Sequence, residues 1–114
     1  MKFIDWDRLM SLRHDIGEED FADVAFVFFS EMDGKLLELL EDPTRRTADD
    51  FHFLRGSAAN LGFVAMAEAC ETAEAACREG RVPDLDDVTG SFRGALAEVQ
   101  PRLPELDGAS AFAA

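Results

Sequence analysis

The stretch Phe51-His52-Phe53-Leu54-Arg55-Gly56-Ser57-Ala58-Ala59-Asn60-Leu61-Gly62 is the most informative part of this chain. Its apolar residues recur at spacings of three and four, which predicts one buried stripe of a helix. The stripe consists of Phe51, Leu54, Ala58 and Leu61. His52 follows Phe51 by one residue, about 100° of helical turn, so we expect the imidazole at the edge of the stripe, partly in water.

Gly56 lies four residues after His52 and therefore on the same surface of the predicted helix. A glycine inside a helix costs about 1 kcal/mol relative to alanine, so its presence needs a reason. The absence of a side chain would let another molecule approach the imidazole closely. Arg55 and Ser57 flank this gap with a positive charge and a hydroxyl, and arginine suits a phosphoryl group because it forms charge-assisted hydrogen bonds.

The pattern resembles the signature of histidine-containing phosphotransfer (HPt) domains of two-component phosphorelays, roughly His-x-Leu-Lys-Gly-Ser-x-x-x-Leu-Gly. The corresponding positions are His52, Leu54, Arg55, Gly56, Ser57, Leu61 and Gly62. Arg55 departs from the family pattern, which more often has lysine there. The charge is kept but its shape changes, so the resemblance implies an electrostatic role for Arg55 and no particular hydrogen bond.

The resemblance assigns a role to each residue of the motif. His52 would accept a phosphoryl group from a phosphoaspartate and pass it reversibly to another aspartate. Arg55 would steer and screen the phosphoryl group, Gly56 would provide clearance, and Ser57 would give a supporting hydrogen bond, either to the imidazole or to the backbone one turn earlier. An imidazole has an unperturbed pKa of about 6.5, so its free nitrogen is a competent nucleophile near neutral pH.

The resemblance also implies partners. These are the receiver domains of response regulators, with a hybrid sensor histidine kinase as a further candidate. Phosphoryl transfer depends on positioning and charge neutralisation, and we expect the partner's receiver domain to supply Mg²⁺, with no cofactor or metal site in this chain. The residues expected to contact the partner are Phe26, Phe29, Phe53 and Asn60.

Composition predicts an all-α protein. The chain has 114 residues and is 47% apolar, with no tyrosine and one tryptophan, and β-branched alternation is nearly absent. We expect an antiparallel four-helix bundle with an additional short N-terminal helix. Residues 1–103 are predicted to form a single domain, and residues 104–114 a flexible C-terminal tail.

The boundaries of the helices follow from capping residues and breakers. The N-terminal helix should begin at Asp5, with Ile4 packing on Leu9, and end near Gly17. The other predicted helices span residues 18–41, 45–60, 64–79 and 85–100. In the helix of residues 18–41 we expect an inner stripe made of Phe21, Val24, Phe28, Met32, Leu36 and Leu39.

The net charge of −13 should repel nucleic acid and anionic membrane, so we expect neither as a partner. No apolar run approaches the roughly 20 residues of a membrane span, and the start of the chain lacks the features of a signal peptide. We therefore expect a cytoplasmic protein, and a monomer. Cys70 and Cys77 are expected to be small core residues.

Alternative functions remain open at this stage. A non-catalytic acidic helical adaptor would bind signalling partners without phosphotransfer. A metal-binding bundle is suggested by the spacing of Asp49 and His52, with Glu68, Glu71 and Glu74 on the next helix, but a second carboxylate-x-x-His pair is missing. No Gly-rich nucleotide loop is present, so we expect no autokinase activity. The chain would be a phosphorelay intermediate and not a turnover enzyme.

Overall fold

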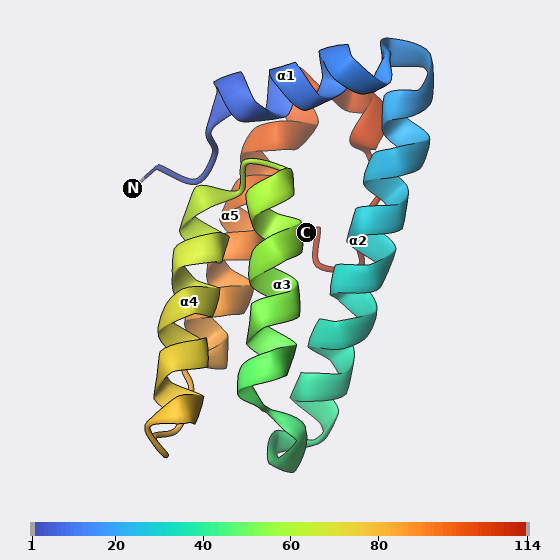
Figure 1. Ribbon diagram of the computed structural model, residues 1–114. Helices are drawn as coiled ribbons and strands as arrows, with labels where there is room; N and C mark the ends of the chain where they lie inside the picture. Colours follow the sequence, from blue (N-terminus) through green and yellow to red (C-terminus); the bar gives the residue numbers. More distant parts are fainter. Residues whose placement is uncertain (1, 114) are drawn as a thin grey trace.

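The computed structural model describes residues 2–113, and within them the chain is helical with no strands. The helices are α1 (Trp6–Ile16), α2 (Glu18–Glu41), α3 (Ala48–Asn60), α4 (Val64–Arg78) and α5 (Leu85–Arg102), with short 3-10 helices η1 (Pro43–Arg45) and η2 (Pro104–Leu106). Helices α2 to α5 run side by side as an antiparallel bundle, and α1 lies across one end (Figure 1). The molecule measures 43 × 24 × 22 Å along its principal axes. The predicted all-α bundle with an additional N-terminal helix is confirmed.

Side-chain caps explain where α1 and α3 begin. The Asp5 carboxylate accepts a hydrogen bond from the backbone N–H of Arg8 at the start of α1. Thr47 and Asp50 cap α3 reciprocally, each side chain accepting from the other residue's backbone N–H. This capping box is strong enough to define the start of a helix, so α3 begins at Ala48 and not near residue 45 as predicted.

The turn between α3 and α4 is fixed to the start of α1. Gly62 has a φ of +73°, and the backbone N–H of Asp5 donates to its carbonyl oxygen at 2.7 Å. A Cβ atom at Gly62 would lie 2.7 Å from the carbonyl oxygen of Asp5. A side chain there would therefore be strained and would also push α1 away from the histidine-bearing helix.

The buried face of α2 differs from the predicted one. Phe21, Ala25, Phe29, Met32, Leu36 and Leu39 are buried, whereas Val24 and Phe28, which were expected in the stripe, are only half-buried. Residues 24–29 are apolar without interruption, so helical spacing allows more than one register there. The ring of Phe29 packs against Phe63 and Phe92 at centroid distances of 6.0 and 6.2 Å, and this contact selects the observed register.

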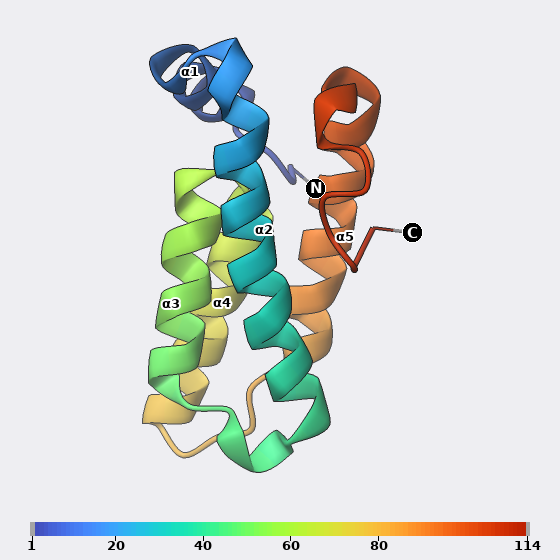
Figure 2. The ribbon, with the colours of Figure 1, turned by 90° about the vertical axis from the view of Figure 1, so that its right-hand side faces the viewer.

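Residues 104–113 pack onto the bundle, in contrast to the flexible tail predicted for 104–114; residue 114 lies outside the described residues. Leu106 and Phe112 are buried, and the Phe112 ring lies 5.8 Å from that of Phe92. The Ser110 hydroxyl donates to Asp33 of α2 at 2.7 Å. Figure 2 shows this segment returning between α2 and α5. Burial of two large apolar side chains explains why the segment does not fray.

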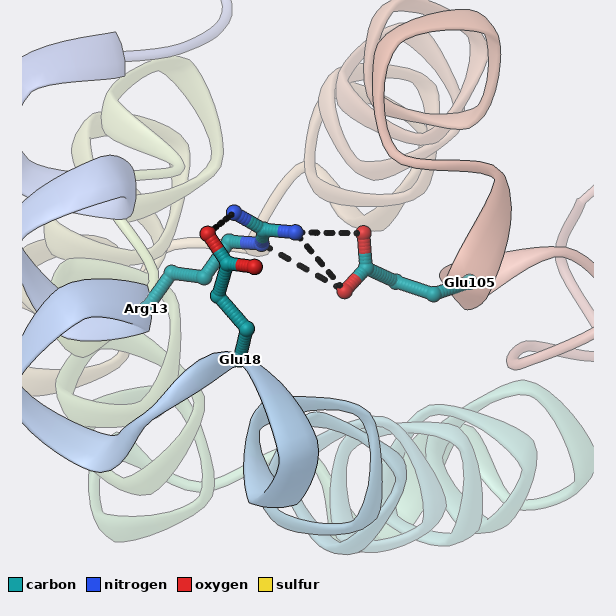
Figure 3. A network of polar contacts seen from close by, with 3 residues as sticks. All are labelled: Arg13, Glu18 and Glu105. Atoms are coloured by element: carbon teal, nitrogen blue, oxygen red, sulfur yellow. Dashed lines mark hydrogen bonds and ion pairs between the residues drawn. The ribbon is translucent and has the colours of Figure 1, made fainter.

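Arg13 of α1 forms ion pairs that connect α1 to the C-terminal segment (Figure 3). Its guanidinium contacts both carboxylate oxygens of Glu105 at 3.2 and 3.3 Å, and it also contacts Glu18 at 3.0 Å. The Glu105 pair is partly shielded from water, whereas Glu18 is exposed. The bidentate pair fixes η2 against α1 more effectively than an exposed ion pair would.

None of the helices in the described part of the chain is both long and apolar enough to span a membrane.

Candidate functional site

Helix α3 presents His52 to solvent, with 61% of its side chain exposed. Gly56 lies one turn further on the same surface, and a Cβ atom added to it would meet nothing within 4 Å. The space beside the imidazole is therefore open, as the sequence predicts. A second molecule can approach His52 along this surface without displacing any group of the bundle.

Two charged groups contact the imidazole. A guanidinium nitrogen of Arg55, Nη2, lies 3.0 Å from Nδ1 of His52. Oε2 of Glu74, on the neighbouring helix α4, lies 3.3 Å from the same Nδ1 atom. Arg55 also approaches Glu74 directly, with 3.7 Å between its Nε and Oε1. The cation expected beside His52 is therefore present, together with an anion that was not expected there.

Sequence reasoning named Glu74 only as a carboxylate of the metal-binding alternative and gave it no other role beside His52. Glu74 is 8% exposed, and Arg78 donates to its Oε2 atom at 2.9 Å. This hydrogen bond is the main reason why the pKa of Glu74 lies below its ordinary value; burial opposes the shift, while Arg55 and His52 add to it. The sequence does contain a signal for this contact, because Glu74 falls in the same helical stripe as the small residues Ala73 and Cys77. A charged side chain in a buried stripe needs a partner of opposite charge or a hydrogen-bond donor.

Ser57 lies on the core side of α3 and is only 7% exposed. It follows His52 by five residues, about 140° around the helix, so the two side chains diverge. Within residues 2–113 no hydrogen bond joins its hydroxyl to His52. Of the two alternatives left open for the Ser57 hydroxyl, neither the hydrogen bond to the imidazole nor the one to a backbone carbonyl one turn earlier is formed within residues 2–113.

Phe53 lies beside His52 on the side of α2, with 41% of its surface exposed. The ammonium of Lys35 lies 6.0 Å from its ring centroid and forms an ion pair with Asp50 at 3.0 Å. The hydrogen bond with Asp50 raises the pKa of Lys35. Burial acts to raise the pKa of Asp50, but the hydrogen bonds from Thr47 and Lys35 outweigh it and hold that pKa below its ordinary value.

The two phenylalanines of α2 that were expected to contact a partner do not belong to this site. Phe29 is completely buried, so the prediction of a direct partner contact is wrong for it. Phe26 is 38% exposed but precedes Lys35 by nine residues, which places it about 180° around α2 from the side that faces α3. Its exposed ring therefore lies away from His52.

Asn60 is exposed at the C-terminal end of α3, and its side-chain oxygen accepts from Arg8 of α1 at 3.5 Å. Between these helices and α4 runs an open groove of about 510 Å³, lined among others by Arg8, Arg55, Gly56 and Glu68. The groove begins at the clear surface next to His52. Because Arg55 and Gly56 line it, the groove adjoins the surface of α3 that carries the imidazole.

No group of three or more His, Cys, Asp or Glu side chains in residues 2–113 is arranged to hold a metal ion.

A helical bundle with an exposed histidine beside a cation and an empty glycine surface is the arrangement that the sequence motif predicts for a phosphotransfer domain. The comparison with protein families agrees with this class. The model of the Hpt domain family matches residues 23–102, which is more than half of the chain. The chain therefore belongs to the Hpt domain family, whose members perform phosphotransfer in two-component signalling. Neither the curated proteins nor the solved structures gave a match.

Proposed function

We propose that this protein accepts a phosphoryl group on His52 from the phosphoaspartate of a receiver domain and relays it, reversibly, to an aspartate of another response regulator. The observation that carries this proposal is the exposed imidazole beside the open surface at Gly56. Membership of the Hpt domain family supports it. A hybrid sensor histidine kinase is a further candidate donor.

The chemistry divides between the two proteins. His52 supplies the nucleophile, and Arg55, 3.0 Å from the ring, supplies a cation that can shift toward the phosphoryl oxygens. The receiver domain supplies the scissile acyl phosphate and binds Mg²⁺, which neutralises charge on the transferred group. Phe53 and Asn60 border the surface on which the receiver domain would dock.

The direct test uses purified protein, a radiolabelled phospho-receiver domain and Mg²⁺. Wild type should take up acid-labile, alkali-stable label, as expected of phosphohistidine. His52→Gln should take up none, and its fold should persist because the side chain is mostly in water. His14→Gln is the matched control, since it removes the other histidine, which is exposed on α1, and it should be labelled normally.

ATP alone should label none of the three proteins. Failure of wild type to take label from every receiver domain offered, despite intact folding, would instead favour a non-catalytic acidic adaptor. A cytoplasmic location and a monomeric state stay predictions from the sequence.

A further inference from the structure

The outer face of α2 carries large apolar side chains that the bundle does not bury. Seven large apolar side chains are exposed in residues 2–113, and four of these belong to α2, with exposed fractions of 38% to 58%. The four residues are Phe26, Val27, Leu37 and Leu40. Single exposed apolar residues are common on soluble proteins, whereas several on one face of a helix mark an interaction surface.

This face points away from His52. Lys35 marks the side of α2 that faces α3, because its ammonium forms an ion pair with a carboxylate of α3 at 3.0 Å. Val27 lies about 80° around the helix from Lys35, and the other three apolar residues lie about 140° to 180° from it. Figure 2 looks onto α2 from outside the bundle and shows no other segment in front of it. The outer face of α2 therefore stays accessible when a receiver domain docks at His52.

The middle of the outer face has only small side chains. Ser30 and Gly34 are exposed between the two apolar pairs, and a Cβ atom added to Gly34 would meet nothing within 4 Å. A glycine inside a helix lowers helix stability relative to alanine, and no segment of the described chain fills the space that Gly34 leaves. Large side chains on both sides of small ones form a hole that accepts a large side chain of a second helix.

The charges on the outer face are negative. Asp23, Glu31 and Glu41 are exposed, and each lies three or four positions from one of the apolar residues, on the same surface of the helix. None of the three forms an ion pair within residues 2–113. Lys35 is the only basic residue of α2, and it already pairs with two carboxylates. A complementary surface would therefore combine an apolar stripe with positive charges.

We propose that the outer face of α2 binds a basic amphipathic helix of a partner protein. The partner helix places a large apolar side chain over Gly34 and Lys or Arg side chains opposite the flanking carboxylates. A second copy of this chain does not fit, because a two-fold contact would bring the carboxylates of both copies together, and each copy has a net charge of −13. The inference does not rest on the proposed function, since the face is separate from His52.

A synthetic peptide tests the proposal directly. The probe is an amidated, helix-forming peptide of leucine and lysine, about 18 residues long, which covers the roughly 21 Å of helix between Phe26 and Leu40. Its leucines recur at spacings of three and four, so they form one stripe. Added to ¹⁵N-labelled protein at physiological salt, it should shift the backbone amide signals around Ser30 and Gly34 and leave that of His52 unchanged. A peptide of the same composition with its leucines distributed around the helix should bind more weakly, on the order of tenfold.

Variants of the protein provide the second measurement. Leu37→Lys should weaken binding of the striped peptide on the order of tenfold in calorimetric titrations. Val82→Lys is the matched control and should bind the peptide like wild type, because Val82 is also exposed but lies in the connection between α4 and α5. Replacing Asp23 and Glu41 by their amides should weaken binding several-fold and reduce its dependence on salt concentration.

Equal binding of the striped peptide by wild type and Leu37→Lys would overturn the inference, because the peptide would then be held only by the overall negative charge. Amide signal shifts centred on His52 would also overturn it. Sedimentation equilibrium gives a further check, since a wild-type dimer that Leu37→Lys dissociates would assign the outer face to a second copy of this chain and contradict a basic partner helix.

Discussion

Replacing Gly56 with alanine is expected to stabilise the isolated protein and to slow phosphotransfer. A Cβ atom at this position meets nothing within 4 Å, so the bundle accommodates the methyl group without rearrangement. Alanine in a helix interior is more stable than glycine by about 0.5–1 kcal/mol. With an entropy of unfolding of about 2.1 cal/mol/K per residue, this corresponds to a melting temperature roughly 2–4 °C higher for a chain of this length.

The same methyl group should oppose docking, because it projects from the surface that carries His52. A displacement of the reacting groups by about 1 Å can cost on the order of 100-fold in rate, so we expect Gly56→Ala to transfer phosphate at least several-fold more slowly. Gly56→Glu should be affected more severely, since it adds bulk and a negative charge that repels the acidic pocket of a receiver domain.

Gly90→Ala is the matched control for both measurements. Gly90 is also an exposed helical glycine with nothing within 4 Å of an added Cβ, but it lies on α5. This variant should gain similar stability, measured by calorimetry, and should transfer phosphate like wild type. If Gly56→Ala or Gly56→Glu transferred at the rate of Gly90→Ala, the assignment of Gly56 as the clearance for docking would be refuted.

Phe29→Ala should lower the free energy of unfolding by about 3–5 kcal/mol in urea titrations because it empties a buried site, while Phe26→Ala should cost under about 1 kcal/mol; equal losses would contradict the observed register of α2. Phe112→Ala should lower the free energy of unfolding by about 3 kcal/mol because its ring packs on the core. An unchanged free energy of unfolding would instead support the prediction that this segment is a flexible tail. Glu74 and Asp50 have folded-state pKa values below their ordinary 4.5 and 3.8, so their stabilising contacts are complete above those values and are lost as the pH falls through the lower folded-state values. The loss of stability on acidification below about pH 4.5 should therefore be smaller in a variant that carries both Glu74→Gln and Asp50→Asn than in wild type. An equal loss of stability in the two proteins would argue against these contacts.

Much of the fold was accessible from local sequence. Asp5 and Gly17 mark the ends of α1, and α2 spans residues 18–41 as predicted. Caps and breakers act within a few residues, so their effect is visible in the sequence. The exposed position of His52 followed from helical periodicity, and the hypothesis about its chemistry came from a motif that spans α3 and the turn after it.

The remaining features depended on contacts between distant segments. Three-residue and four-residue spacing could not choose a register for α2, because apolar residues run without a break there; packing of Phe29 against Phe63 and Phe92 decided it. Phe112 was predicted to lie in a flexible tail because a short apolar segment has no periodicity of its own. In the structure its ring is buried against Phe92 in the core.

The site shows the same division. The sequence by itself predicted the exposed histidine, the neighbouring cation and the clear surface, because His52, Arg55 and Gly56 share one helical face. Only the tertiary structure brought Glu74 to the imidazole, 22 positions away in sequence. The physical reason is that α4 packs closely on α3 through small side chains, and no local pattern records which residue of one helix will lie opposite a given residue of the next.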